Sequence, residues 1–412
     1  MTSTLLIKNI HKLYGVASNG ISFKKGASMP EVEIIEDAYI LTKGDIIQAY
    51  GSMQQCPVDA DMVIDAAGKC VLPAWCDSHT HIVFAQGREL EYVDKLKGKS
   101  YEEIAANGGG IINSAKKLRE LPEDMLYERA LNRLNEVIRT GTGAIEIKSG
   151  YGLTLDSELK MLRVIKRLKA ATEATIKATF LGAHAIPPEY KDNRERYIDL
   201  ITNEMLPQVS ESQLADYCDV FCEQGFFTVE ETDKILKAAA QYGLKAKIHA
   251  NQLNISGGVQ VGIANHAISV DHLEAVGDEE IEALKHTDTI PTVLPSCSFF
   301  LNIPYAPARK MIQAGLGIAM ATDFNPGSSP SGNIPLLMSL ACNNMRLLPA
   351  EAFNAVTING AYAMELGDSH GAIGTGRKAN LIITKAIPSL EYMVYSFGSQ
   401  HINQVILNGR LV

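Results

Sequence analysis

Two histidines one residue apart, His79 and His81, lie at the end of an apolar run that begins at Val71. In a β-strand, side chains at positions i and i+2 point to the same face, so both imidazoles can converge on one point. Two neutral imidazoles aimed at one point form half of a site for a zinc- or iron-type ion. The alternative is a solvated or hydrogen-bonded histidine pair near a loop, so the pair predicts a metal site only if other residues complete it.

Further candidate ligands follow apolar segments elsewhere in the chain. His184, His249 and His272 each end such a segment, and Asp323 follows the apolar run 317–322. One histidine at a strand end is more often structural, but several at corresponding positions indicate a shared site. A carboxylate behind an apolar strand is costly to leave unpaired, so Asp323 is expected to have a cationic partner.

The donor set His79, His81, His249 and Asp323 offers three imidazoles and one carboxylate, which suits either Zn²⁺ or Fe³⁺. A catalytic metal keeps one position open for water and lowers the pKa of that water to about 7. We expect Asp323 to act also as the proton acceptor, and His272 to polarise the substrate carbonyl or orient the water.

The elements that must position these residues alternate from about residue 71 onwards. Short apolar strands alternate with long helix-patterned segments, which is typical of βα units on a parallel sheet. The helical segments include Glu123–Arg139, Ser157–Thr172 and Thr228–Tyr242. The candidate strands are Leu72–His81, Ala144–Lys148, Ile176–His184, Tyr217–Glu223, Ala246–His249, Ala267–His272, Thr289–Leu294 and Ile318–Asp323. Eight such units predict a (β/α)8 TIM-like barrel, whose working residues lie at the C-terminal ends of the strands.

Both ends of the chain lack this alternation of strands and helices and instead show short strands bounded by turn residues. The strand-like segments are Thr4–Lys8, Asp37–Leu41, Ile46–Tyr50, Asn380–Thr384 and Gln404–Arg410. We expect residues 1–70 and 370–412 to form one composite β-sandwich domain, and residues 71–369 to form the barrel.

Composition excludes several classes of function. The chain has 412 residues with 38 basic and 47 acidic side chains, and a net charge of −9 argues against a nucleic-acid partner. Seven cysteines without repeated spacing indicate reduced thiols rather than a disulfide framework. No signal peptide and no apolar run near ~18 residues is found. We therefore expect a cytoplasmic protein that binds no membrane.

The chain resembles the amidohydrolase superfamily over nearly its whole length. The motifs that carry this resemblance are Pro73–His81, the lone His249, the Asp323 strand end and the tail segment Gly371–Leu381. A binuclear relative would need a bridging ligand, usually a modified lysine at the end of the fourth strand. The candidate fourth strand, Tyr217–Glu223, contains no lysine. We therefore predict a single metal ion per chain.

More narrowly, the chain resembles the imidazolonepropionase family. The segments that match are Phe84–Glu89, Glu146–Leu153, Phe180–His184 and Thr322–Ser328. The resemblance implies hydrolytic ring opening of 4-imidazolone-5-propanoate to N-formimidoyl-L-glutamate, the third step of histidine degradation. It also implies a homodimer.

This substrate gives roles to further residues. Its propanoate tail is an anion, which the guanidinium of Arg88 is suited to hold bidentately. The other expected substrate contacts are Tyr151, His184, Gln252, Asn325, Gly327 and Ser328. Without the resemblance, Arg88 would be interpreted as an ion-pair partner of Glu89 or Glu91, and Tyr151 as a packing residue.

One position departs from the family pattern. Some members carry Glu where this chain has Gln252, and a glutamine side chain cannot shuttle a proton. We therefore assign the proton acceptor role to Asp323, which would take a proton from the attacking water and pass it to the leaving ring nitrogen. His272 would stabilise the oxyanion that develops on the ring carbonyl.

Two other classes of function remain open on the sequence alone. One is a different cyclic-amide hydrolase, or an aminohydrolase that acts on a heterocycle. The other is a catalytically silent barrel that serves as an interaction scaffold. The second is disfavoured because every expected ligand position is filled.

Overall fold

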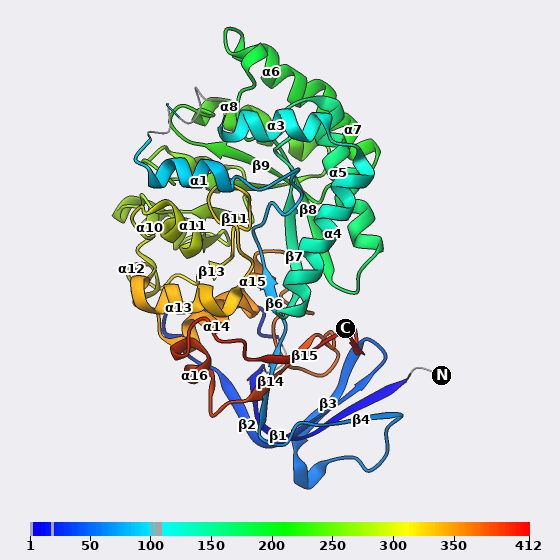
Figure 1. Ribbon diagram of the computed structural model, residues 1–412. Coiled ribbons are helices and arrows are strands. Elements are labelled where there is room, and N and C mark those ends of the chain that lie inside the picture. Colours follow the sequence, from blue (N-terminus) through cyan, green and yellow to red (C-terminus); the bar gives the residue numbers. More distant parts are fainter. Residues whose placement is uncertain (1–2, 18–19, 100–102, 104–108) are drawn as a thin grey trace.

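Two eight-stranded sheets organise the residues that the computed structural model describes, which are 3–17, 20–99, 103 and 109–412. In Figure 1, one sheet lies at the lower end of the molecule beside both chain termini. The other lies above it and is surrounded by helices. The site expected from the sequence belongs to the upper sheet.

The upper sheet is a parallel barrel whose neighbouring strands follow one another in chain order. Its strands are β6 (Trp75–Asp77), β7 (Thr142–Lys148), β8 (Thr175–Ala183), β9 (Tyr217–Cys222), β10 (Lys245–Ala250), β11 (Ser269–His272), β12 (Ile290–Val293) and β13 (Ala319–Met320). Two backbone hydrogen bonds join the segments beyond β6 and β13. His81 N–H donates to the Phe324 carbonyl and Asp323 N–H donates to the His79 carbonyl, both at 2.9 Å. The predicted (β/α)8 barrel is confirmed.

Every residue of β7 and β9 is buried, which explains why most residues of these strands are apolar in the sequence. The covering helices are α1 (Glu89–Leu96), α3 (Gly110–Glu120), α4 (Glu123–Arg139), α5 (Leu155–Ala170), α6 (Arg194–Leu200), α7 (Leu206–Glu211), α8 (Val229–Gln241), α9 (Gly258–Ala264), α10 (Asp278–Leu284), α11 (Pro295–Leu301), α12 (Ala308–Gln313), α13 (Ile334–Met345), α14 (Pro349–Val356) and α15 (Ile358–Tyr362). The predicted helix Glu123–Arg139 has the bounds of α4, and the other two predicted helices correspond to α5 and α8.

The lower sheet is built from both ends of the chain, in the order β16-β15-β14-β5-β1-β2-β3. Its strands are β1 (Thr4–Val16), β2 (Glu33–Lys43), β3 (Ile46–Ser52), β4 (Met62–Asp65), β5 (Lys69–Pro73), β14 (Leu381–Ala386), β15 (Ile402–Leu407) and β16 (Arg410–Leu411), with α16 (Leu390–Tyr395) between β14 and β15. Both β4 and β5 pair with β1, so the sheet branches there, as a sandwich-like arrangement allows. A separate sheet domain made from both termini is confirmed, while its limits at residues 70 and 370 stay a prediction.

The predicted strand Leu72–His81 is two strands, and the prediction of one strand was wrong. Pro73 pairs with Leu381 in the lower sheet, and Ala74 N–H donates to the Asn380 carbonyl. Trp75 then begins the pairing of β6 with β7 in the barrel. A continuous apolar run cannot show that its two halves join different sheets. As a result, His79 and His81 lie in the extended segment just beyond β6.

The last barrel strand is also shorter than predicted. β13 spans only Ala319–Met320, and Asp323 lies beyond it with a φ of 51°. A left-handed backbone at a residue with a side chain is uncommon, and it shows that Asp323 does not continue the extended strand.

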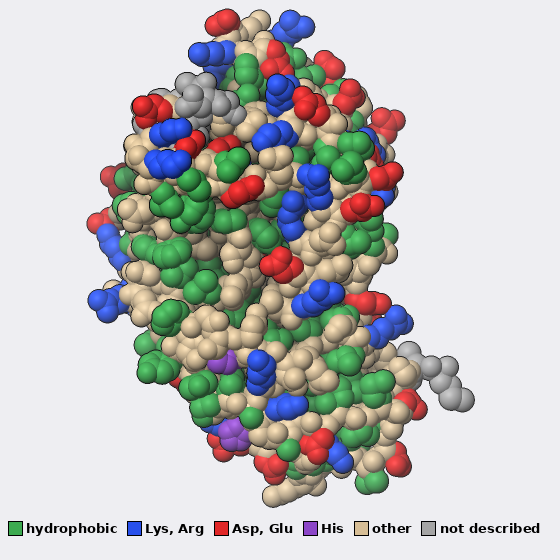
Figure 2. All heavy atoms as spheres, viewed as in Figure 1, with side chains coloured by type: hydrophobic (Ala, Val, Ile, Leu, Met, Phe, Trp, Pro, Cys, Tyr) green, Lys and Arg blue, Asp and Glu red, His purple; other side chains and the backbone are tan. Residues whose placement is uncertain are grey.

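The outer surface carries charges of both signs. On the face shown in Figure 2, Lys and Arg side chains are interspersed with Asp and Glu side chains. Among the described helices, none is long and apolar enough to cross a membrane.

Candidate metal centre and active site

Three histidines and one aspartate converge at the C-terminal end of the barrel. The Nε2 atoms of His79 and His81 lie 3.3 Å apart, and that of His249 lies 3.4 Å from His81 Nε2. Asp323 Oδ1 lies 3.6 Å from both His79 Nε2 and His81 Nε2. All four side chains are buried. The residues predicted as ligands therefore meet around one point.

The contacts of Nδ1 in His79 and His249 show that Nε2 is the ring nitrogen left to bind a cation. His79 Nδ1 lies 2.6 Å from Asp271 Oδ2, and His249 Nδ1 lies 3.0 Å from Asp219. In each ring a carboxylate lies against Nδ1, so Nε2 is the nitrogen that faces the centre. Burial, together with the charge of Lys148, lowers the pKa of His79 well below its usual value. Burial and His249 do the same to His81.

This arrangement fits a metal ion. Lone pairs of neighbouring Nε2 atoms repel one another unless a cation lies between them, and Asp323 adds a negative oxygen to the same space. Three imidazoles and a carboxylate are ordinary zinc or iron ligands. The donor set thus supports the metal site that was expected from the sequence.

A buried cluster of charges lies beneath the ligands and holds two of them. Lys148 Nζ lies 2.5 Å from Glu146 Oε1, 2.8 Å from Asp219 Oδ2 and 3.6 Å from Asp271 Oδ2. Lys247 pairs with the other oxygen of Glu146. Each of these side chains is 0% exposed. The same amine therefore contacts both carboxylates that orient ligand histidines.

The charge states in this cluster follow from its contacts. Burial alone would raise the pKa of the Asp219 carboxyl, but His249 and Lys148 lower it below its usual value. Burial likewise opposes the charge on Lys148, but Asp219, Glu146 and Asp271 raise the pKa of its amine above the usual value. Lys148 is therefore protonated and positively charged, and its amine has no free lone pair with which to bind a metal.

His272 lies next to the ligand cluster. Its ring centroid is 5.3 Å from that of His249 and 5.6 Å from that of His79. The backbone φ of His272 is 87° and that of the following Leu273 is 67°. Together with Asp323, these positive φ values place strained backbone at the mouth of the barrel, where such strain is often functional.

His184 and Tyr151 lie on another side of the cluster. The His184 ring stacks on His81 with centroids 5.5 Å apart, and the Tyr151 ring lies 5.9 Å from His81. Burial and His249 lower the pKa of His184 to about 3, so its ring is neutral. Because Nδ1 lies 3.1 Å from the Gly150 carbonyl, it carries the proton and Nε2 is left as an acceptor. Burial raises the pKa of the Tyr151 phenol, which keeps it a hydrogen-bond donor.

The loop after β13 surrounds Asp323 with polar groups. Ser328 Oγ donates to Asp323 Oδ2 at 3.2 Å, and Asn325 Nδ2 donates to the Asp323 carbonyl at 2.7 Å. Asn325 Oδ1 accepts the backbone N–H groups of Gly327 and Ser328. Three of the predicted substrate contacts thus build one turn beside the carboxylate.

Arg88 and Gln252 lie at the rim of the site, each with a partner of its own. Arg88 Nε donates to Glu91 Oε2 at 2.7 Å, the ion pair that the sequence left open as an alternative. A Cβ at Gly327 would overlap Arg88 Nη1, so the guanidinium lies against the loop that follows Asp323. Gln252 Nε2 lies 3.5 Å from Cys297 Sγ. The structure brings all the predicted site residues to one end of the barrel, and their roles stay predictions.

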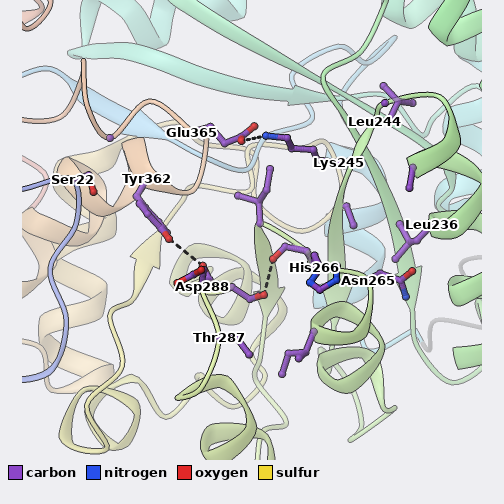
Figure 3. A pocket seen from close by; sticks show the side chains of 18 of the residues that line it. Ser22, Leu236, Leu244, Lys245, Asn265, His266, Thr287, Asp288, Tyr362 and Glu365 are labelled. Carbon is purple, nitrogen blue, oxygen red and sulfur yellow. Dashed lines mark hydrogen bonds and ion pairs between the residues drawn. The ribbon is translucent and has the colours of Figure 1, made fainter.

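The protein has a hollow at each end of the barrel, and they differ in how near they lie to the predicted metal centre. The larger, of about 1030 Å³, lies at the opposite end, where Lys245, Ile268 and Thr289 stand at the beginnings of β10, β11 and β12. Figure 3 shows its Lys245–Glu365 ion pair and the hydrogen bond from Tyr362 to Asp288. The smaller hollow, of about 650 Å³, is lined by Arg88 and Gly327 together with residues of α1 and α11. Only the second adjoins the predicted site.

Sequence reasoning missed the buried charges beneath the ligands. Asp219 and Asp271 lie within mainly apolar segments and Lys148 ends one, and a charged residue in such a segment was the available signal. Charged residues in buried strands are expected to be paired, but a single sequence does not say with which partner.

A model of the amidohydrolase family matches residues 70–412 of the chain. An imidazolonepropionase from Flavobacterium johnsoniae is 57% identical over 408 residues, which cover 99% of this chain and 99% of that protein. An imidazolonepropionase from Caldanaerobacter subterraneus subsp. tengcongensis is 44% identical and covers 98% of this chain and 97% of its own length.

Solved structures share the fold at low sequence identity. A guanine deaminase from E. coli superposes with a TM-score of 0.76 at 15% identity, covering 100% of this chain and 99% of its own. An adenosine deaminase from Xanthomonas campestris, crystallised with bound zinc, gives a TM-score of 0.70 at 14% identity and covers 99% and 92%.

Proposed function

The chain belongs to the imidazolonepropionase family of amidohydrolases, and from this premise we propose how its residues divide the work of that reaction. It is a hydrolase of histidine degradation, and it opens the ring of 4-imidazolone-5-propanoate to give N-formimidoyl-L-glutamate. The observation that carries the assignment of roles is the convergence of three Nε2 atoms and one carboxylate.

We assign the metal to His79, His81, His249 and Asp323, as one Zn²⁺ or Fe³⁺ per chain. When bound, the metal supplies Lewis acidity that activates water and polarises the ring carbonyl. Among the described residues, the lysines buried beneath these ligands are Lys148 and Lys247, and neither is free to bridge a second metal because both are held in ion pairs. The homodimer and the cytoplasmic location expected from the sequence stay predictions.

We assign the proton transfer to Asp323. Its Oδ1 faces the histidine cluster, while Ser328 holds Oδ2 at 3.2 Å and fixes the plane of the carboxylate. It would take a proton from the attacking water and deliver it to the ring nitrogen that leaves. His272, on the neighbouring side, would donate a hydrogen bond to the carbonyl oxygen as negative charge develops there.

The remaining polar residues would bind and orient the substrate. Tyr151 can donate a hydrogen bond and the Nε2 of His184 can accept one, so the pair suits a ring that carries both a carbonyl and N–H groups. Gln252 can do both but cannot exchange a proton. Arg88 would hold the propanoate, because only its Nε is used by Glu91.

The test of this proposal is turnover of 4-imidazolone-5-propanoate by the purified holoenzyme, with metal content measured on the same sample. We expect N-formimidoyl-L-glutamate as the product and a single tightly held ion per chain. Ammonia release from a purine or pyrimidine without ring opening would overturn the substrate assignment. Two ions that both survive extensive dialysis would overturn the single metal.

Replacing Arg88 with Met is expected to raise KM and lower kcat/KM by about tenfold or more. Hydrogen bonds to charged groups contribute about 1.5–3 kcal/mol, and the methionine removes them while keeping most of the side-chain volume. Steady-state kinetics on the natural substrate measure the effect.

The matched control is Lys95→Met, which removes a positive charge from the wall of the same hollow. Within the described part of the chain, Lys95 Nζ donates to the backbone carbonyls of Phe300 and Leu301 and to no other group, so the kcat/KM of Lys95→Met is expected to stay near that of the wild type. A loss below about threefold in Arg88→Met, roughly 0.6 kcal/mol, would show that Arg88 serves only its ion pair with Glu91.

A further inference from the structure

A second group of side chains of metal-ligating types lies beside the first and shares no residue with it. His272, Glu274 and Cys297 are all buried, and each offers one ligand atom within 4.8 Å of the others. His272 ends β11 and Glu274 follows two residues later, whereas Cys297 lies in the first turn of α11. The group therefore belongs to the sixth and seventh strands of the barrel, next to the sector that holds His249.

One oxygen of Glu274 has no partner in the described part of the chain. Ser298 Oγ donates to Oε1 at 3.2 Å, and His272 Nδ1 lies 3.5 Å from the same oxygen. Oε2 is buried and makes no hydrogen bond. A buried carboxylate oxygen without a partner is costly, so this atom points to a missing positive group.

The three donors suit a borderline-soft divalent cation. Imidazole, carboxylate and thiolate are the ordinary zinc ligands, and a thiolate selects against magnesium and calcium. The two anionic donors would neutralise a dication. The His272 and His249 ring centroids are only 5.3 Å apart, so an ion here would lie near an ion at the first site. Neutralisation by the two anionic donors reduces the repulsion between the two ions.

We propose that His272, Glu274 and Cys297 form a second, weaker site for a zinc-type divalent cation. Binding forms a bond from the cation to Cys297 Sγ and releases the thiol proton to solvent. The site is weaker than the first for two reasons. It offers three protein donors instead of four, and a cation bound here is repelled by an ion held at the first site.

A simpler explanation of the contacts of Glu274 involves no cation. Its Oε1 could serve only to orient the His272 ring, with Ser298 holding the carboxylate and Cys297 as a bystander. The two accounts differ in whether sulfur binds the cation. They therefore differ in a spectroscopic signal that the first site cannot produce, since its ligands are nitrogen and oxygen only.

The experiment is titration of the metal-free chain with Co²⁺, without substrate. The first equivalent should fill the histidine site and give only weak visible bands. The second should add an intense near-ultraviolet thiolate-to-cobalt charge-transfer band. Cys297→Ser should lose this band and still bind the first equivalent, while Cys342→Ser, a half-buried thiol elsewhere, should keep it.

A Glu274→Gln variant keeps the thiol and tests the carboxylate. If Glu274 is a ligand, the dissociation constant for the second Co²⁺ should rise about tenfold or more. An unchanged midpoint in this variant would overturn the role of Glu274. No charge-transfer band in the wild type at excess Co²⁺, or an unchanged band in Cys297→Ser, would overturn the site. Because no substrate is present, these results do not depend on the proposed reaction.

Discussion

Replacing Asp323 with Asn is expected to abolish turnover. The amide keeps the size of the side chain, but its nitrogen carries no lone pair for a metal and neither atom accepts a proton at neutral pH. Loss of a general base alone costs about 10²–10⁴ in rate. Since Asp323 Oδ1 also lies 3.6 Å from two ligand histidines, the variant loses a negative ligand as well. The measurement is kcat under metal-saturating conditions.

Metal content separates the two roles of this carboxylate. If the Asn variant keeps its ion and is inactive, the proton transfer is what was lost. Asp368→Asn makes the same chemical change at an exposed position at the other end of the barrel, and should retain normal kcat. Near-normal activity of Asp323→Asn would contradict the assignment of Asp323 to the chemistry.

Replacing Lys148 with Met is expected to lower both stability and metal affinity. Methionine matches the length of lysine but leaves Asp219, Glu146 and Asp271 buried without their shared cation. Removing one partner of a buried ion pair costs about 3–5 kcal/mol. Because Asp219 and Asp271 orient His249 and His79, metal affinity should fall about 10–100-fold. Denaturant unfolding of the metal-free chain and chelator competition measure the two effects.

Lys245→Met is the matched control for this prediction. Lys245 stands at the beginning of β10 and pairs with Glu365, but both side chains reach solvent, at 59% and 34% exposure. An exposed pair contributes about 0–1 kcal/mol, so this variant should unfold near the wild-type midpoint and bind metal normally. Wild-type metal affinity in Lys148→Met would show that the aspartates hold the histidines without help from the amine.

Much of the fold could be predicted because a parallel barrel has a strong local signature. Its strands are buried on both faces, so β7 and β9 appear in the sequence as apolar runs between amphipathic helices. The start of α8 is equally local, since Thr228 and Glu231 form a capping box. The metal ligands were found for the same reason, because each stands at the end of such a segment or just beyond it.

The surroundings of the ligands could not be predicted, because they depend on partners far away in the chain. Asp271 contacts His79 across 192 residues, and Lys148 contacts Asp219 across 71. No local pattern states these pairings. The division of the run from Leu72 to His81 between two sheets was missed for the same reason, since it is decided by Leu381.

The pairing of β5 with β14 has a consequence for biosynthesis. Cys70 N–H donates to Thr384 Oγ1 across 314 residues, so β5 has no pairing with β14 until residue 384 has been synthesised. Contacts between residues so far apart in sequence form slowly, and until they form the unpaired strand edge is prone to aggregation. Through Ala74, β5 leads directly into β6 and the segment of His79 and His81. The final placement of His79 and His81 is therefore expected to follow the synthesis of β14.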